Sequence, residues 1–432
     1  MEPGIVLGIV LAILLVLSVP IAMCLGLASL AAILVMSSDF LIFLPQKFLA
    51  GIDSFTLLAI PLFILAGTIM GEGGIAHRII DLAMVFVGRL RGGLGMVSII
   101  STMFFSGVCG SASADTAAIG SVTIPAMKKK KYPGTFATAI VAAAGGTSQL
   151  VPPSIDLIII GIVANISIGG LFAAGFLPGF VNGIFLMALV YFYAWKMNLP
   201  LEPKIIFSEK LRIIRRGSLA ILMVIIILGG ILGGIFTPTE ASSVAVVYGF
   251  IVSFFIYKEL KIQDIPKVFL RTSELTGIVF LVLGMASVFS YVLTFERIPH
   301  AIAESIKFYA DSWIIFVLFV NIVFFLLGMI MDALPALIIL MPILVPVGVS
   351  LGMHPIHIGI LVQANVGVSL ISPPVGVCLY VACGLSKEPL EKVIKSLIPF
   401  YIVLVATVLI ISYVPEIALY IPRLLGYVEY IF

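Results

Sequence analysis

The chain alternates long apolar runs with short polar segments. Residues 5–35, 219–235 and 398–414 are examples of such runs, and a membrane span requires roughly 20 apolar residues. Lys and Arg gather in the polar segments, for example at 89–91 and 128–131, and the positive-inside rule places such clusters on the cytoplasmic side. The pattern predicts an all-α polytopic membrane protein and excludes a soluble globular domain.

Composition agrees with this pattern. The 432 residues are 62% hydrophobic and 10% charged, whereas soluble domains carry about 25% charged residues. A net charge of +3 is too small to indicate a nucleic-acid partner. The four cysteines form no CxxC pair, so they indicate neither a disulfide framework nor a metal cluster. The first apolar run lacks a basic leader and a small-residue cleavage site, so we expect it to be a retained span.

Two apolar segments do not fit a simple count of spans. Residues 92–127 have basic residues at both ends and the small, polar sequence SGVCGSASADTAAIG in their middle. They should therefore enter and leave on the cytoplasmic side as a re-entrant helical hairpin. Residues 312–346 have the same character, and we expect them to enter from the opposite side. Non-helical backbone at such a tip is tolerated only where protein or a water-filled cavity covers it.

Two more apolar segments are interrupted by adjacent prolines, in GGTSQLVPPSIDL and GVSLISPPVGV. Proline lacks a backbone N–H and pushes the preceding residue out of the helical region. We therefore expect discontinuous helices over 132–163 and 358–385.

The hairpins and broken helices form a repeat. Asp115 precedes Pro125 by ten residues and Asp332 precedes Pro342 by ten, and the two Pro-Pro pairs follow at an offset of about 220 residues. Because the charge pattern gives the two copies opposite orientations, they are predicted to be inverted repeats. Inverted repeats with broken helices are typical of secondary transporters that bind substrate and ions near the membrane midplane.

The predicted boundaries follow from this repeat. The chain is expected to be one integral membrane unit with a first repeat at 1–200, a linker and connecting span at 201–239, and a second repeat at 240–425. A transport domain is expected at 92–165 plus 312–385. The remainder is expected to supply mainly scaffold and arms.

Unwound backbone at the breaks predicts two cation sites. Free carbonyls and hydroxyls are hard oxygen ligands, and they favour Na⁺ over metals that prefer imidazole or thiolate. The residues expected at the first site are Ser106, Gly107, Ser111, Gly145, Gly146, Thr147, Val151 and Pro152. Those expected at the second are Gly328, Asp332, Gly367, Ser369 and Ser372.

Further polar residues are candidates for substrate binding or coupling: Ser113, Asp115, Ser154, Asp156, Glu240 and Arg297. Intramembrane carboxylates such as Asp115 are costly unless they are paired or face a cavity. Glu240 can instead cap the start of its helix. Arg297 can hold a substrate carboxylate with two parallel hydrogen bonds, or it can anchor an arm at the membrane interface.

Five ordered motifs resemble the DctM-like family, the large membrane subunit of tripartite ATP-independent periplasmic (TRAP) transporters. They are GIDSFTLLAIPLFILAGTIM, SGVCGSASADTAAIGSVTIPAM, LVPPSI, GIFTPTEAS and SPPVGVCLYV. The resemblance implies a Na⁺-driven elevator in a bacterial inner membrane, with Na⁺ as coupling ion and no other cofactor. It also implies a DctQ-like small membrane subunit and a periplasmic binding protein as partners. The implied substrates are organic acids such as C4-dicarboxylates, sialic acid and related carboxylates.

The sequence does not indicate an enzyme, but it leaves two alternatives within membrane transport. HExxH and GxSxG motifs are absent from the sequence, and no His lies near a candidate nucleophile in the apolar segments, so an enzyme is not expected. His354 and His357 form an H-x-x-H pair without a third metal ligand. A stand-alone divalent-anion/Na⁺ symporter remains an alternative. An anion channel is another, because discontinuous helices can also line pores.

Overall fold

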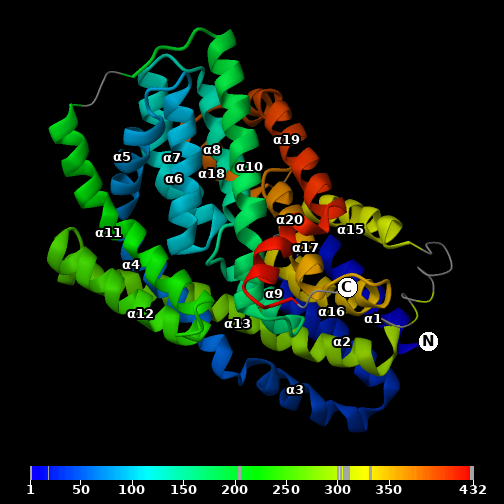
Figure 1. Cartoon of the computed structure of the whole chain (residues 1–432). Coiled ribbons are helices and arrows are strands. Elements are labelled where there is room, and N and C mark those ends of the chain that lie inside the picture. Colours follow the sequence, from blue (N-terminus) through cyan, green and yellow to red (C-terminus); the bar gives the residue numbers. More distant parts are fainter. Residues whose placement is uncertain are drawn as a thin grey trace.

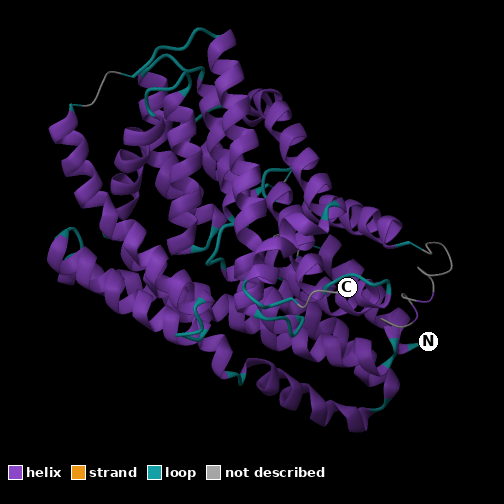
Figure 2. Cartoon of the chain, in the orientation of Figure 1, coloured by secondary structure: helices purple, strands orange, loops and turns teal. Residues whose placement is uncertain are grey.

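The computed structural model describes residues 2–17, 19–202, 206–298, 301, 304, 312–329, 333–374 and 376–428. These residues form helices joined by loops, without strands (Figure 2). Within this part of the chain, five helical stretches are long and apolar enough to cross a membrane: Phe55–Glu72, Ile168–Lys196, Pro238–Ile256, Ile262–Phe295 and Leu390–Tyr413. The predicted all-α polytopic fold is confirmed.

The first apolar run departs from the prediction of one span. It forms two helices, α1 (Pro3–Val16) and α2 (Ile21–Met36), which pack against each other. Pro20 is the N-cap of α2, and its missing N–H ends the preceding helical pattern. A further helix, α3 (Phe43–Ile52), was not anticipated from the sequence.

Five helices pack together on one side of the molecule. α4 (Ala59–Glu72) packs against α12 (Pro238–Phe250) and α13 (Ile265–Phe295), and α2 and α3 lie along α13. Figure 1 shows α12, α13 and α3 crossing the lower part of the view. α11 (Phe207–Leu232) leads into this group and packs against the amphipathic helix α5 (Ile75–Val87). We refer to α2, α3, α4, α12 and α13 as the scaffold group.

The two predicted hairpins are pairs of helices. α6 (Gly93–Cys109) and α7 (Ala112–Lys129) pack together and are joined at Gly110, whose φ of 66° is the left-handed conformation that glycine adopts readily. α15 (Trp313–Gly328) and α16 (Ala333–Ser350) form the second pair. The turn between α15 and α16, residues 330–332, lies outside the described residues. The membrane side from which each pair enters stays a prediction.

Both discontinuous helices are confirmed. The first is α8 (Gly134–Ser148) followed by α9 (Ile155–Val163), and the second is α17 (Pro355–Ser369) followed by α18 (Val377–Ser386). Each helix stops shortly before its Pro-Pro pair, and both Pro-Pro bonds are cis. The central helices α8 and α17 are buried over almost their whole lengths. α6, α7, α10 (Ile168–Lys196) and α19 (Leu390–Tyr413) pack around α8 (Figure 1).

Two glycines bring the broken helices into backbone contact. A Cβ placed on Gly146 would lie 2.4 Å from the carbonyl oxygen of Gly367, and a Cβ on Gly367 would lie 2.4 Å from that of Gly146. Only a residue without a side chain permits this approach. The two breaks are therefore held close together at the centre of the molecule.

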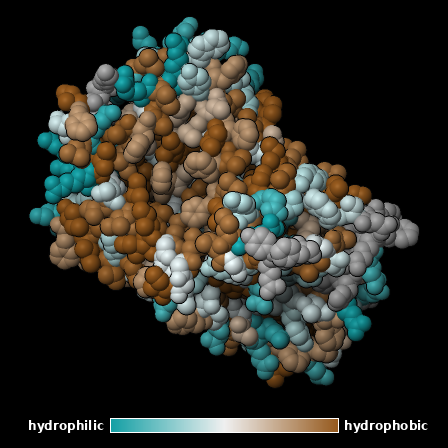
Figure 3. All heavy atoms as spheres, in the orientation of Figure 1, coloured by the Kyte–Doolittle hydropathy of each residue, from teal (hydrophilic) through white to brown (hydrophobic). Residues whose placement is uncertain are grey.

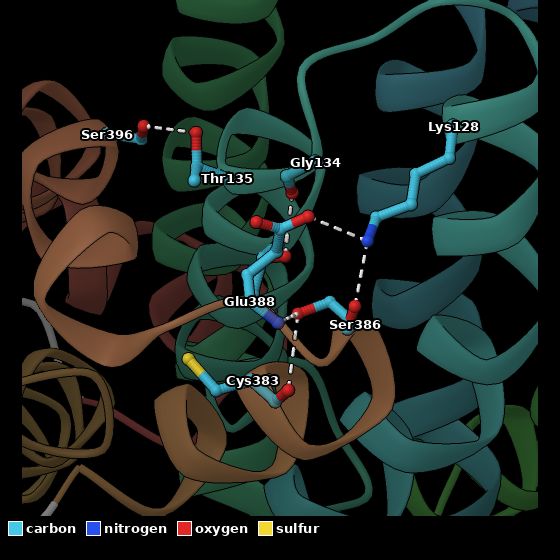
Figure 4. A network of polar contacts seen from close by, with 8 residues as sticks. Lys128, Gly134, Thr135, Cys383, Ser386, Glu388 and Ser396 are labelled. Atoms are coloured by element: carbon cyan, nitrogen blue, oxygen red, sulfur yellow. Dashed lines mark hydrogen bonds and ion pairs between the residues drawn. The ribbon is translucent and has the colours of Figure 1, made fainter.

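A polar network ties the two repeats together near the end of α7. Lys128 Nζ donates to Glu388 Oε1 at 2.8 Å and to the carbonyl of Ser386 at 2.7 Å, and Ser396 Oγ donates to Thr135 Oγ1 at 2.9 Å (Figure 4). These contacts join the first hairpin and α8 to the loop after α18 and to α19. On the face drawn in Figure 3, brown apolar side chains cover much of the middle of the molecule, and such a surface suits a lipid environment.

Candidate functional site

A cavity of about 410 Å³ separates the scaffold group from the tip of the first hairpin. Its scaffold wall comes from α4 and α13, and its opposite wall comes from the hairpin tip and the break before α9. Leu334 of α16 and Leu370 and Val377 beside the second break complete it. The cavity therefore lies where the two hairpins and both broken helices meet the scaffold group.

The hairpin tip is fixed to the first broken helix. The N–H of Ile155, the first residue of α9, donates to the carbonyl of Gly110 at 3.4 Å. On the other side, Gly67 of α4 lies against Cys109, because a Cβ on Gly67 would be 2.8 Å from the Cα of Cys109. The tip thus sits between α9 and the scaffold group.

A fully buried carboxylate lies behind this tip. Ser148 Oγ is 3.1 Å from Asp115 Oδ2 and 2.7 Å from the carbonyl oxygen of Gly145. Ser106 Oγ donates to the carbonyl of Ser148 at 2.8 Å. Asp115 Oδ1 has no hydrogen-bond partner among the described residues. Burying a polar oxygen without a partner is unfavourable.

Other residues of the predicted first site gather here. A Cβ on Gly107 would lie 3.1 Å from the Pro152 carbonyl oxygen, so the hairpin backbone touches the break directly. Gly145 approaches Thr116 closely, and Thr147 Oγ1 donates to the carbonyl of Ala143 at 3.0 Å. Val151, half-buried, completes the same segment. Ser111 instead lines the cavity.

The residues predicted for the second site also lie together, as far as the described part of the chain reaches. A Cβ on Gly328 would lie 1.8 Å from that of Ser369, so the end of α15 touches the end of α17. Ser369 Oγ donates to the Val366 carbonyl at 2.8 Å, and Ser372 Oγ donates to the Val368 carbonyl at 2.8 Å. Asp332 lies outside the described residues.

A second buried polar network connects the two broken helices, and it includes residues that the sequence did not single out. Gln363 Nε2 donates to the carbonyl of Gln149 at 3.0 Å and to Asp156 Oδ2 at 3.4 Å. The side-chain amide of Gln149 satisfies its neighbours when its O and N are exchanged. Gln149 Nε2 then donates to Asp156 Oδ2 at 3.2 Å, and Gln149 Oε1 accepts from the Ala112 N–H at 2.6 Å. Ser154 Oγ lies 3.0 Å from the Gln149 amide. Gln149 and Asp156 both line the cavity.

The remaining substrate candidates divide into two groups. Ser113 lines the cavity beside Ser111, with the two hydroxyls 3.4 Å apart. Glu240 and Arg297 are not among the cavity residues. Glu240 forms a capping box with Thr237 at the start of α12, as the capping interpretation predicts. Arg297 is exposed, just after α13.

The scaffold wall carries charged residues that the sequence did not single out. Arg271 and Glu72 line the cavity, with Arg271 Nη1 4.0 Å from Glu72 Oε1. Lys267, one turn earlier on α13, lies 3.1 Å from the same oxygen. Arg271 belongs to a basic cluster that indicates membrane orientation, and nothing in the sequence pattern separated it from its neighbours.

Two helical hairpins and two interrupted helices around a cavity with several polar lining residues are typical of a polytopic membrane transport protein. Residues 8–417 match the family model of the tripartite ATP-independent periplasmic transporter, DctM component. The chain belongs to this family of large permease subunits. It is a multi-pass protein of the bacterial inner membrane and a transporter component rather than an enzyme. Membership in a tripartite family implies a small membrane subunit and a periplasmic binding protein as partners.

Relatives of known name resemble the chain over nearly its whole length. The C4-dicarboxylate TRAP transporter large permease protein DctM of Pseudomonas aeruginosa is 38% identical over 93% of this chain and 94% of its own. The sialic acid TRAP transporter large permease protein SiaM of Vibrio cholerae is 34% identical over 94% and 96%. The YdaH transporter of Alcanivorax borkumensis has a related fold, with a TM-score of 0.61 at 13% identity over 87% and 88% of the two chains.

Proposed function

We propose that this chain performs Na⁺-coupled secondary active uptake of an organic acid that a periplasmic binding protein delivers. Relatives are named for C4-dicarboxylate, sialic acid, isethionate and 2,3-diketo-L-gulonate. These compounds share an anionic acid group, which supports an organic acid as the substrate of this chain.

The arrangement of the two breaks is the observation that carries the Na⁺ proposal. Gly146 and Gly367 meet backbone to backbone, and each break presents carbonyls and a serine hydroxyl beside a hairpin end. Oxygen-rich pockets of this kind suit Na⁺. The unpaired Oδ1 of Asp115 adds a negative ligand near the first break. This placement supports the proposed roles of Ser106, Gly107, Gly145, Thr147 and Pro152.

An elevator mechanism is supported by how the parts are joined. Buried hydrogen bonds join each hairpin to a broken helix, Ser106 to Ser148 and Asn365 to Asn321, whereas the scaffold group contacts the hairpins through the packing of α4 on α6 and of α13 on α16, beside the cavity. Opening the site by separating hairpin from helix would expose the buried carboxylate and break these bonds. Moving the hairpins and broken helices as one body leaves the bonds intact. An anion without Na⁺ would carry unbalanced charge in that body, so partly loaded protein should cross slowly.

The test is uptake by proteoliposomes that contain the chain, its small subunit and its binding protein. Succinate, N-acetylneuraminate and isethionate serve as labelled probes in separate assays. Uptake should rise sigmoidally with external Na⁺ because two cation sites must fill. Undiminished uptake in choline would contradict Na⁺ coupling, and a hyperbolic dependence would contradict the second cation site. An anion channel would conduct without Na⁺. Uptake that needs Na⁺ therefore rejects the channel alternative, and uptake that is independent of Na⁺ favours it.

A further inference from the structure

The cavity has one cationic side chain among its described lining residues, Arg271 of α13. Its nearest charged neighbour is Glu72 of α4, at 4.0 Å between Nη1 and Oε1. That oxygen is also 3.1 Å from Lys267 Nζ, so Glu72 already has a closer cationic partner. No other hydrogen bond or ion pair is recorded for Arg271 in the described part of the chain.

The guanidinium is therefore positioned to accept a ligand. Guanidinium carries five N–H donors in a planar fork that matches a carboxylate or sulfonate group. The 4.0 Å separation from Glu72 is longer than a charge-assisted hydrogen bond, which spans about 2.7–2.9 Å. An acid group entering the cavity gains these donors, and only the loose contact with Glu72 competes for them.

The facing wall supplies neutral polar groups. Ser111 and Ser113 at the hairpin tip and Gln149 at the first break line the same cavity. A ligand whose acid group meets Arg271 can place hydroxyl or amide groups against these side chains. Glu72 and Asp156, which also line the cavity, oppose a second anionic group.

We propose that Arg271 binds one acid group of the transported organic acid, and that Glu72 weakens binding by competing for Arg271. The inference rests on the proposed function, because it names how that substrate is held. Arg271 belongs to the scaffold group, whereas Ser111, Ser113 and Gln149 belong to the hairpin and the break. In an elevator, the acid group reaches Arg271 only in the arrangement seen here, so Arg271 favours that state when substrate is bound.

Binding is measured on the purified full chain with its small subunit, in Na⁺ buffer, by the rise in unfolding temperature with increasing succinate, N-acetylneuraminate or isethionate. Sodium chloride of equal ionic strength is the reference. Arg271→Gln should lower the affinity for the best-bound probe by about tenfold to a hundredfold, the usual effect of losing hydrogen bonds to a charged group. The affinity of Arg271→Lys should lie between those of the wild type and Arg271→Gln, because an ammonium keeps the charge but lacks the planar fork of donors.

Two further variants separate binding from structure. Lys267→Gln is the matched comparison: Lys267 does not line the cavity, but its loss leaves Glu72 free to pair with Arg271, so probe affinity should fall slightly and far less than in Arg271→Gln. Glu72→Gln should raise the affinity by up to several-fold by freeing Arg271, because exposed ion pairs couple weakly. If the ion pair between Glu72 and Arg271 had only a structural role, Glu72→Gln and Arg271→Gln would shift probe affinity in the same direction.

The outcomes distinguish this inference from the function on which it rests. Unchanged probe affinity in Arg271→Gln overturns the role of Arg271 and leaves Na⁺-coupled uptake standing. If none of the three probes stabilises the wild-type protein, an acid-binding site at Arg271 is also rejected. Loss of acid binding in Arg271→Gln together with uptake that ignores Na⁺ supports this inference and overturns Na⁺ coupling.

Discussion

The two hairpin and broken-helix pairs share one backbone plan but differ in their polar groups. Gly107, Gly146 and Ser148 in the first pair match Gly328, Gly367 and Ser369 in the second at an offset of about 220 residues. The two serines make equivalent bonds, Ser148 to the Gly145 carbonyl at 2.7 Å and Ser369 to the Val366 carbonyl at 2.8 Å. The geometry of the break is thus repeated.

The surroundings of the two serines differ. Ser148 also contacts the buried carboxyl group of Asp115. The matching aspartate of the second repeat, Asp332, lies outside the described residues. The second pair also carries amides: Asn365 Nδ2 donates to Asn321 Oδ1 at 2.7 Å, linking α17 to α15. The shared plan therefore makes two oxygen-rich breaks, and among the described residues this amide contact distinguishes the second of them.

The largest effect is expected from Asp115→Asn. It removes the buried charge that we assign to the first cation site, and loss of one charge-assisted contact costs about 3 kcal/mol, or roughly a hundredfold in Na⁺ affinity. The measurement is the Na⁺ concentration for half-maximal uptake. Asp81→Asn, on the amphipathic helix α5 away from the cavity, is the control and should leave the Na⁺ dependence unchanged. An unaltered Na⁺ dependence in Asp115→Asn would contradict the role of Asp115 in the first cation site.

Gly146 and Gly367, at which α8 and α17 come into backbone contact, should be equally sensitive to substitution. Gly146→Ala and Gly367→Ala each place a Cβ 2.4 Å from the opposite carbonyl oxygen, so each should destabilise the protein by about 1–3 kcal/mol through overpacking. Unfolding temperature of the detergent-solubilised protein reports this loss. Gly384→Ala is the matched helical control, because nothing lies within 4 Å of its Cβ, and it should be neutral or stabilising. Tolerance of either central alanine would show that the helices do not cross as described.

The equivalent serines should respond unequally. Ser148→Ala removes a contact with Asp115 as well as the bond to its own helix, whereas Ser369→Ala removes only a local bond. We expect Ser148→Ala to raise the Na⁺ requirement about tenfold, and Ser369→Ala to change it less. Equal shifts in half-maximal Na⁺ would mean that the contact between Ser148 and Asp115 does not contribute to the first cation site.

The smallest effect is expected at the tie between the repeats in Figure 4. Lys128 and Glu388 are partly exposed, with side-chain exposures of 34% and 26%, so their coupling should be about 1 kcal/mol or less. A double-mutant cycle of Lys128→Met and Glu388→Gln, measured by unfolding temperature at low and high salt, gives that coupling. A coupling that persists undiminished at high salt would contradict this weak, screened pair.

The sequence predicted the breaks well because their cause is local. A Pro-Pro pair disrupts a helix through its own backbone chemistry, and Gly110 readily adopts the left-handed conformation that ends α6. Pro20 gave the same kind of signal, but the uniform apolar run around it favoured one span, and the structure has α1 and α2. The short helix α3 was missed because its residues continue a mixed apolar pattern.

The candidate site could be predicted only in part. Asp115 stood out as a charge inside an apolar segment, and the backbone ligands followed from the breaks. Gln363 and Gln149 are 214 positions apart in the chain, and only the crossing of α8 and α17 brings them together. Arg271 lies among basic residues that indicate orientation, and its place in the cavity depends on how α13 packs. Such contacts are set by tertiary packing, which a single sequence does not reveal.

The central claim is that the first hairpin moves past the scaffold group, and one crosslink tests it most directly. Gly67 of α4 lies against the native Cys109: a Cβ on Gly67 would be 3.2 Å from the Cys109 sulfur and 2.8 Å from its Cα, so the reduced Gly67→Cys protein is the reference for its own oxidised form. In proteoliposomes, oxidation of Gly67→Cys should join α4 to the hairpin, and Gly71→Cys, which has nothing within 4 Å of its Cβ, is the control. The account predicts that oxidised Gly67→Cys protein takes up no substrate and recovers on reduction. Full uptake by the crosslinked protein would contradict a moving hairpin.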